Sequence, residues 1–169
     1  LGSLKASRDE MIEGYKSALR SSSDGARSNA VQKLSELKTK EAVNELVKAR
    51  GDAIEYVRES AAKGIEELGL SAEEKLAAYM QGLTSGNATV RWVSLAELGK
   101  LKDRRAVSGV KGLVNDRDDE VRKLAIEVLG LLGGNEAEIF IAKLDDRSLE
   151  IVVGAIRELG NLKAVKAVE

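Results

Sequence analysis

Acidic residues gather at two places where carboxylates could hold a cation. Asp116, Asp118, Asp119 and Glu120 fall within five positions, and the pair Asp145 and Asp146 follows about one repeat later. A calcium loop needs alternating oxygen ligands, a turn glycine and a distant glutamate, and neither cluster supplies that pattern. Asp118 and Asp119 instead precede an apolar-periodic segment, where they suit the cap and first turn of a helix. The sequence therefore predicts no metal site.

The composition removes further kinds of chemistry. The 169 residues contain no Cys, His or Pro, which excludes thiol nucleophiles, imidazole bases, disulfides and zinc sites built on nitrogen or sulfur. With 27 basic and 28 acidic residues, the net charge of −1 makes nucleic acid an unexpected partner. No apolar run is long enough to span a membrane and no signal-peptide pattern opens the chain, so a cytoplasmic location is expected. No cofactor site is expected either.

The sequence contains an internal repeat of about 31 residues, and any functional site must be built on the elements of this repeat. We call Arg27, Arg58, Arg91, Arg122 and Val152 the anchors; they are separated by 31, 33, 31 and 30 residues. The residue three positions after each anchor is small, and the residue seven positions after it is Leu or Ile. Together with apolar residues one position before and four and ten positions after each anchor, these positions form one face of an α-helix.

A second helix follows each of these helices, so that every unit is a helix pair with an apolar stripe on both members. Such a pair of about 31 residues cannot close a core alone and must stack on its neighbours. We expect one repeat domain over residues 1–169, with a half repeat or cap at 7–21 and a partial repeat at 146–169. The complete repeats are predicted at 22–51, 52–84, 85–114 and 115–145. The incomplete ends suit a fragment of a longer repeat protein, or frayed ends.

The segment from Asp116 to Ala125, followed by Leu129 and Gly130, resembles the HEAT repeat, specifically its short bilin-lyase-like subtype. Weaker versions recur in other units, such as Thr89 to Arg91 followed by Leu98 and Gly99. The resemblance covers nearly the whole chain and implies an all-α, right-handed α-solenoid of stacked antiparallel helix pairs. HEAT arrays serve as scaffolds, adaptors, transport factors and some enzymes, so the resemblance specifies the fold more closely than the function.

The resemblance also implies a ladder of Arg and Asp side chains along the stack. Its arginines would be Arg27, Arg58, Arg91 and Arg122, and its aspartates Asp52, Asp116 and Asp146. Ser21 and Ser85 replace the aspartate in two units, and Val152 replaces the last arginine. We interpret these charges as structural, because a bidentate contact between Arg and a carboxylate can join adjacent turns.

The favoured function is a non-catalytic scaffold or adaptor that binds another protein, as a helix or an extended peptide, along the concave face. The second helices of the central units carry small neutral residues at positions expected to point outward. The candidate contact residues are Ala78, Gly82, Gly109, Gly112, Ile139 and Lys143, with Trp92 on the outer layer as a further candidate. The small residues could instead serve tight packing between helices, and Trp92 could instead fill a local pocket. Neither alternative involves a partner.

Two other functions stay open at this point. The bilin-lyase resemblance implies an accessory role in chromophore attachment or phycobilisome turnover, although no residue marks a tetrapyrrole pocket. The chain could also be a structural spacer within a longer protein.

Overall fold

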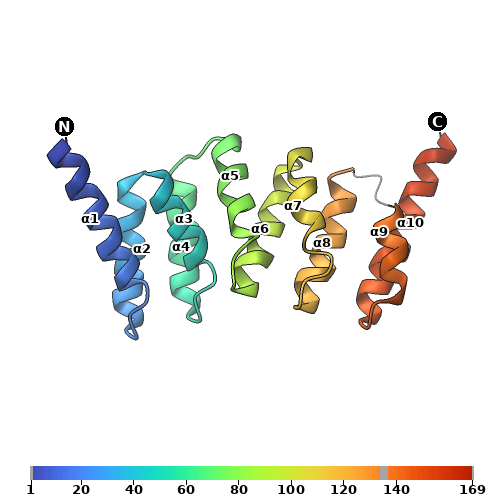
Figure 1. Ribbon diagram of the computed structural model, residues 1–169, viewed down its shortest axis with the longest axis horizontal. Coiled ribbons are helices and arrows are strands. Elements are labelled where there is room, and N and C mark those ends of the chain that lie inside the picture. The colour runs from blue at the N-terminus through green and yellow to red at the C-terminus, as the bar shows by residue number, and fades with distance from the viewer. Residues whose placement is uncertain (1, 134–136, 169) are drawn as a thin grey trace. The chain divides into compact units, whose positions relative to one another are not determined.

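The computed structural model describes the backbone of residues 2–133 and 137–168 and the side chains of residues 8–133 and 137–163. Every regular element in these residues is helical (Figure 1). The chain divides into two compact units, residues 1–90 and 91–169, which we call the N-terminal and C-terminal units. The predicted all-α class, with helices arranged in pairs, is confirmed.

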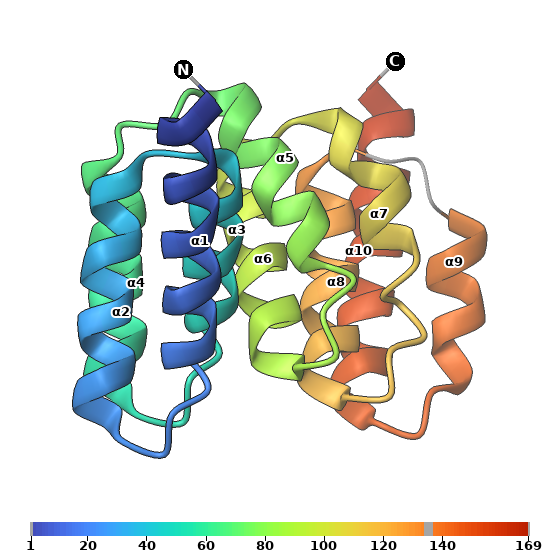
Figure 2. The same cartoon turned by 60° about the vertical axis from the view of Figure 1, so that its left-hand side comes forward.

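The N-terminal unit consists of two layers of helices. First helices lie in one layer, where α2 packs against α4, and second helices lie in the other, where α3 packs against α1 and α5 (Figure 2). Contacts of α3 with α2 and α4 join the layers. The elements are α1 (Gly2–Ala18), α2 (Asp24–Leu37), α3 (Lys40–Ala49), α4 (Glu55–Glu67) and α5 (Ala72–Gly82).

The C-terminal unit repeats this arrangement with shorter second helices. Its first helices α8 and α10 pack side by side, while α7 packs against α8 and α9 against α10. The elements are α6 (Ala88–Leu101, which begins in the N-terminal unit), η1 (Arg104–Ala106), α7 (Val107–Lys111), α8 (Asp119–Leu131), α9 (Ala137–Ala142), η2 (Lys143–Asp145) and α10 (Leu149–Val168).

Side-chain caps fix where several helices begin. Ser23 Oγ accepts a hydrogen bond from the Ala26 amide at 3.3 Å, and Asp118 Oδ1 accepts one from the Val121 amide at 3.1 Å. Ser71 and Glu74 form the reciprocal capping box that their spacing predicts. Ile54 offers no side-chain cap to α4, and Asp52 Oδ1 instead accepts from the Ile54 amide at 2.9 Å.

The turn inside each helix pair uses a left-handed backbone residue at the same repeat position, eleven residues after the anchor. Its φ is 51° at Lys38, 60° at Gly69, 52° at Lys102 and 68° at Gly133. Glycine adopts this conformation freely, whereas an L-residue with a side chain adopts it at a cost. The shared conformation explains why polar or glycine residues end the first helices.

The predicted apolar face of the first helices is the buried one. The small residues three positions after the anchors are at most 1% exposed, and Leu34, Leu98 and Leu129, seven positions after, are 0% exposed. The small residues are Ala30, Ala61, Ser94, Ala125 and Ala155. Within each unit this face forms the core that positions the second helices.

Candidate functional site

Two adjoining cavities of about 230 Å³ each lie between α3 and α5 in the N-terminal unit. Asn44 and Ala78 line both cavities, so the two together form one depression, which we call the α3–α5 groove. The first cavity is lined by Lys38, Thr39, Lys40, Val43, Asn44, Leu70, Glu73, Glu74, Ala77 and Ala78. The second is lined by Asn44, Val47, Lys48, Ala78, Gln81, Gly82, Thr84, Ser85 and Gly86.

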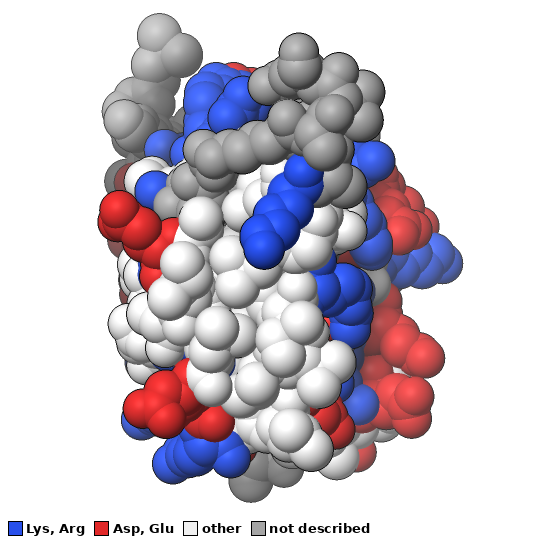
Figure 3. Space-filling view, turned by 90° about the vertical axis from the view of Figure 1, so that its right-hand side faces the viewer, with Lys and Arg blue, Asp and Glu red and all other residues white. Residues whose placement is uncertain are grey.

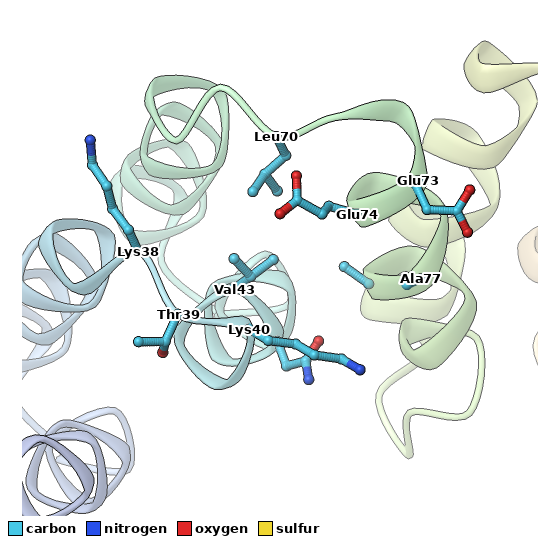
Figure 4. A pocket seen from close by; sticks show the side chains of 10 residues that line it. Lys38, Thr39, Lys40, Val43, Leu70, Glu73, Glu74 and Ala77 are labelled. Carbon is cyan, nitrogen blue, oxygen red and sulfur yellow. The ribbon is translucent and has the colours of Figure 1, made fainter. Parts of the chain in front are cut away.

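The N-terminal ends of α3 and α5 position the first cavity. Thr39 caps α3 by accepting from the Ala42 amide at 3.1 Å, while Glu74 Oε2 accepts from the Ser71 amide at 2.9 Å. Val43, Leu70 and Glu74 turn toward the middle of the cavity, whereas Lys38 and Glu73 extend away from it (Figure 4). The cavity therefore has apolar walls and one carboxylate directed into it.

The Glu74 carboxylate is held in its charged form. Hydrogen bonds from the hydroxyl and then from the backbone amide of Ser71 hold the pKa of Glu74 below its usual range. Lys40, of opposite charge, also lines the first cavity. Both signs of charge thus occur around this part of the groove, as in the rim of a protein interface.

Asn44 is the polar side chain that both cavities share. Its Oδ1 atom is buried and receives no hydrogen bond. A buried carbonyl oxygen without a donor costs about 1–3 kcal/mol. Asn44 therefore holds an unsatisfied acceptor beside the groove, and a ligand donor could compensate for that cost once the amide turned toward the cavities.

Ala78 and Gly82 lie on this groove but do not point outward. Ala78 is only 6% exposed and Gly82 is also buried, so the prediction that both face solvent is wrong. The reason is that α3 packs against α5, and small residues on α5 allow the close approach. Ala77, next to Ala78 on α5, is exposed and lines the first cavity.

Gly109 and Gly112 lie in a second helix that is much shorter than expected. The helical turn begins as η1, α7 covers only Val107–Lys111, and Gly112 follows its last residue. Gly109 is half-buried, while Gly112 is exposed. The expectation of a full helix through both glycines is therefore wrong. The physical reason is that glycine disfavours the helical conformation by about 1 kcal/mol relative to alanine.

The remaining candidates have different surroundings. Lys143 is buried, and its Nζ donates to Asn115 Oδ1 at 2.6 Å, so it is not the outward contact that the sequence predicted. The ammonium group also lies 3.4 Å from Asp146 Oδ2, so it joins the loop before α8 to the loop before α10. Ile139 is half-buried in α9, and Trp92 is 41% exposed in α6.

Three of the four arginines in the predicted ladder form bidentate ion pairs with its aspartates. Arg27 Nε and Nη2 donate to Asp52 at 2.7 and 3.0 Å, and Arg91 Nε and Nη2 donate to Asp116 at 2.7 and 2.6 Å. Arg122 donates in the same manner to Asp146 at 3.2 and 3.0 Å. Each pair joins an anchor to the loop before the next first helix.

Each aspartate also organises its own loop. Asp52, Asp116 and Asp146 accept from the amide two residues later, at 2.9, 2.9 and 3.1 Å. The arginine Nη1 atoms bind carbonyls of the preceding loop, as Arg122 does with Asp116 O at 3.0 Å. Arg58 makes this carbonyl contact, to Asp52 O at 2.8 Å and Ala53 O at 2.9 Å. These pairs connect successive repeats within a unit.

The ladder predicts a loss of stability in acid. The Arg27 hydrogen bonds lower the pKa of Asp52 although burial opposes them. Burial raises the pKa of Asp116 and Asp146, but the hydrogen bonds and charges of Arg91 and Arg122 outweigh it, so both values lie below the usual range. A carboxyl with a lowered pKa stabilises the fold above its unfolded pKa of about 3.9, and that contribution disappears as pH falls through the folded pKa.

We therefore expect the free energy of unfolding to decrease as the pH is lowered below about 4. Urea denaturation at a series of pH values measures this dependence. The variant Asp116→Asn should be less stable at neutral pH and should show a shallower decline in acid. An equal acid dependence in the variant and the parent would contradict the assignment of the decline to the ladder.

Carboxylates of the acidic cluster at residues 116–120 take part in ion pairs and in a helix cap. Asp116 pairs with Arg91, Asp118 caps α8, and Asp119 Oδ1 lies 2.7 Å from Arg147 Nη2. Among the residues that the structure describes, no three acidic side chains are grouped as a metal site would require. The same part of the chain contains no helix that is long and apolar enough to cross a membrane.

Comparison with known proteins gives a consistent picture of the fold. A family model for HEAT repeats matches residues 76–160. The structure of the CpcE and CpcF complex of phycocyanin lyase from Nostoc sp. PCC7120 aligns with a TM-score of 0.55 and 20% identity, covering 90% of this chain and 65% of that one. This chain therefore spans less than two thirds of that protein's length, and the likeness concerns the fold.

Two designed proteins are also similar. An engineered protein from the Northeast Structural Genomics Consortium has a TM-score of 0.49 and 21% identity, with 90% of this chain and 79% of that chain covered. A designed armadillo repeat protein in complex with the peptide (KR)4 has a TM-score of 0.46 and 18% identity, with 94% and 88% covered. No curated protein sequence matches this chain.

Proposed function

Because the chain belongs to the HEAT-repeat family, we propose that it is a non-catalytic interaction module that binds an extended segment of another protein in the α3–α5 groove. The observation that carries this proposal is the pair of cavities that share Asn44, whose oxygen has no hydrogen-bond donor. A catalytic role has no comparable support, since the composition lacks Cys and His and the cavities contain no paired nucleophile and base.

An extended segment suits the groove better than a helix does. The backbone groups of a helix already bond to each other, whereas an extended peptide has free N–H and C=O groups. The terminal torsion of Asn is soft, so the Asn44 amide can turn toward the groove and accept a peptide N–H. Two adjoining cavities, separated by one polar side chain, can receive two side chains of such a segment.

The proposal predicts that filling the first cavity blocks binding. Ala77 is exposed and lines that cavity, while Ala72 is exposed on the same helix outside it. Ala77→Arg should therefore abolish peptide binding, and Ala72→Arg should leave it unchanged. Both variants should keep the stability of the parent to within about 1 kcal/mol, because surface substitutions have small effects.

The binding measurement begins with a library of displayed random peptides selected on the parent chain. Titration calorimetry with the enriched peptides then compares the parent, Ala77→Arg and Ala72→Arg. Enriched peptides that bind Ala77→Arg as tightly as the parent would place the site elsewhere. Failure to enrich any peptide would contradict the function itself.

A second variant separates binding from stability at the same site. Asn44→Ala removes the unsatisfied oxygen and raises helix propensity, so the free energy of unfolding should stay equal or increase by about 1 kcal/mol. The same change removes the group that would bind the peptide backbone and should weaken peptide binding. A variant that is less stable and binds normally would show that Asn44 is only a packing residue.

A further inference from the structure

An apolar face remains uncovered on the C-terminal unit. We call it the end face and define it by Ile141, Leu144, Leu149, Val153 and Ile156, which are 57%, 41%, 75%, 49% and 56% exposed. Figure 3 views the molecule from this side and shows a broad area without charged side chains, with acidic and basic side chains around its rim. Exposed apolar surface of this extent is typical of an interaction site.

One residue of the end face, Ile156, occupies a position that is buried in earlier repeats, whereas Leu149 and Val153 occupy positions that hold exposed residues such as Asp119 and Glu59. Ile156 stands four residues after its anchor, and the corresponding residues Val31 and Ile126 are each 1% exposed. Ile126 is covered by α10 itself, since a Cβ built on Gly154 would lie 3.9 Å from its Cγ2 atom. At Ile156 the face thus continues the surface that the chain uses to stack one first helix on the next, and Leu149 and Val153 extend it with apolar residues that the earlier repeats lack.

The end face lacks the anchor arginine that the ion-paired junctions use. At three of the junctions described above, an anchor arginine pairs with an aspartate of the following repeat, as Arg122 does with Asp146, and at the fourth Arg58 binds loop carbonyls instead. The last anchor is Val152, so the end face carries no arginine for such an aspartate. A partner that presents an apolar surface without this charge fits better.

The other end of the chain does not supply that surface. On α2, the residues two, five and nine positions after the anchor are Asn29, Gln32 and Glu36, and all three are exposed. Stacking head to tail would place these polar groups against Leu149 and Ile156, which would leave them without water or partners. The end face of a second copy offers an apolar surface instead.

The charges beside the apolar stripe are arranged for this pairing. Leu149, Val153 and Ile156 recur on one side of α10, and the exposed residues Glu150 and Arg157 flank them on the same edge, seven residues apart. A twofold axis between Val153 and Gly154 would place Glu150 of one copy opposite Arg157 of the other, twice. Such self-complementarity is what an isologous interface requires.

From this geometry we propose that two copies of the chain associate tail to tail through their end faces, with the two α10 helices antiparallel. Leu149 of each copy then packs between Ile156 and Gly160 of the other, where glycine leaves room for the larger side chain. Glu150 also receives a hydrogen bond from Lys123 of its own copy, through one carboxylate oxygen, and its second oxygen is available to Arg157.

Sedimentation equilibrium of the full chain over a range of concentrations tests the proposal. The parent should be a dimer, and Ile156→Asp should be a monomer with the same circular dichroism. Leu131→Asp is the matched control, because Leu131 is 58% exposed on α8 outside the end face, and it should stay dimeric. Val153→Asp provides a second disruption if Ile156→Asp does not fold.

Charge exchange tests the twofold geometry. Glu150→Arg and Arg157→Glu should each weaken the dimer, and the double variant should restore it. A parent chain that is monomeric at all concentrations, or a dimer that persists in both aspartate variants, would overturn the proposal. A dimer lost in the aspartate variants but not restored by charge exchange would overturn the antiparallel arrangement.

Discussion

Replacement of Leu129 by alanine should lower the free energy of unfolding by about 2–5 kcal/mol. Leu129 lies on α8, where its side chain is 0% exposed and faces the core between the helices of the C-terminal unit. Removing three carbons from this position loses apolar burial and leaves a cavity that closely packed helices cannot close. Guanidinium denaturation followed by circular dichroism measures the change.

Leu131 on the same helix provides the control. It is 58% exposed, so Leu131→Ala should change the free energy of unfolding by no more than about 0.5 kcal/mol. The contrast between two leucines that are two residues apart tests the repeat positions directly. Equal stability of Leu129→Ala and the parent would mean that the buried face has been assigned to the wrong residues.

A loss of about 3–5 kcal/mol is expected when Asp116 is replaced by alanine. The Arg91 and Asp116 side chains are 6% and 7% exposed and lie 2.6 Å apart at their shortest contact, so the variant leaves a buried guanidinium without its carboxylate. It also removes the acceptor of the Asp118 amide. Thermal and chemical denaturation of the variant measure the effect.

A double-mutant cycle isolates the ion pair from the rest of the loop. Arg91→Met combined with Asp116→Ala should recover part of the lost stability, since the uncompensated charge is then absent. Glu97→Ala is the control: it breaks the exposed pair with Lys100 and should cost at most about 1 kcal/mol. Comparable losses from Glu97→Ala and Asp116→Ala would show that the ladder contributes no more than a surface pair.

The sequence predicts the helix pairs and their buried face because both follow from periodicity. Small and apolar residues recur at fixed distances from each anchor, and a helix converts those distances into one side of its surface. Pairing of Arg91 with Asp116 was likewise expected, since the HEAT resemblance assigns both residues to the ladder. The division into individual repeats stays a prediction, and so does the partner-binding role of the candidate contact residues.

The groove could not be predicted in the same way. Ala77 and Ala78 are adjacent identical residues on different sides of α5, and the structure leaves Ala77 exposed while Ala78 is buried. Lys143 was expected at the surface from its position in the repeat, yet its ammonium donates to Asn115 on another loop and to Asp146. Such contacts depend on how neighbouring helices approach each other, which no pattern within one helix encodes.

The left-handed residues at positions 38, 69, 102 and 133 have a consequence for chirality. At these turns the backbone adopts the conformation that a D-amino acid prefers, and the chain meets the requirement with two glycines and two lysines. D-Alanine introduced at position 69 by chemical synthesis would therefore fit the turn, whereas L-alanine would strain it. At each of these four turns the chain reverses direction through a residue with left-handed backbone conformation. Glycine suits this position because it is achiral.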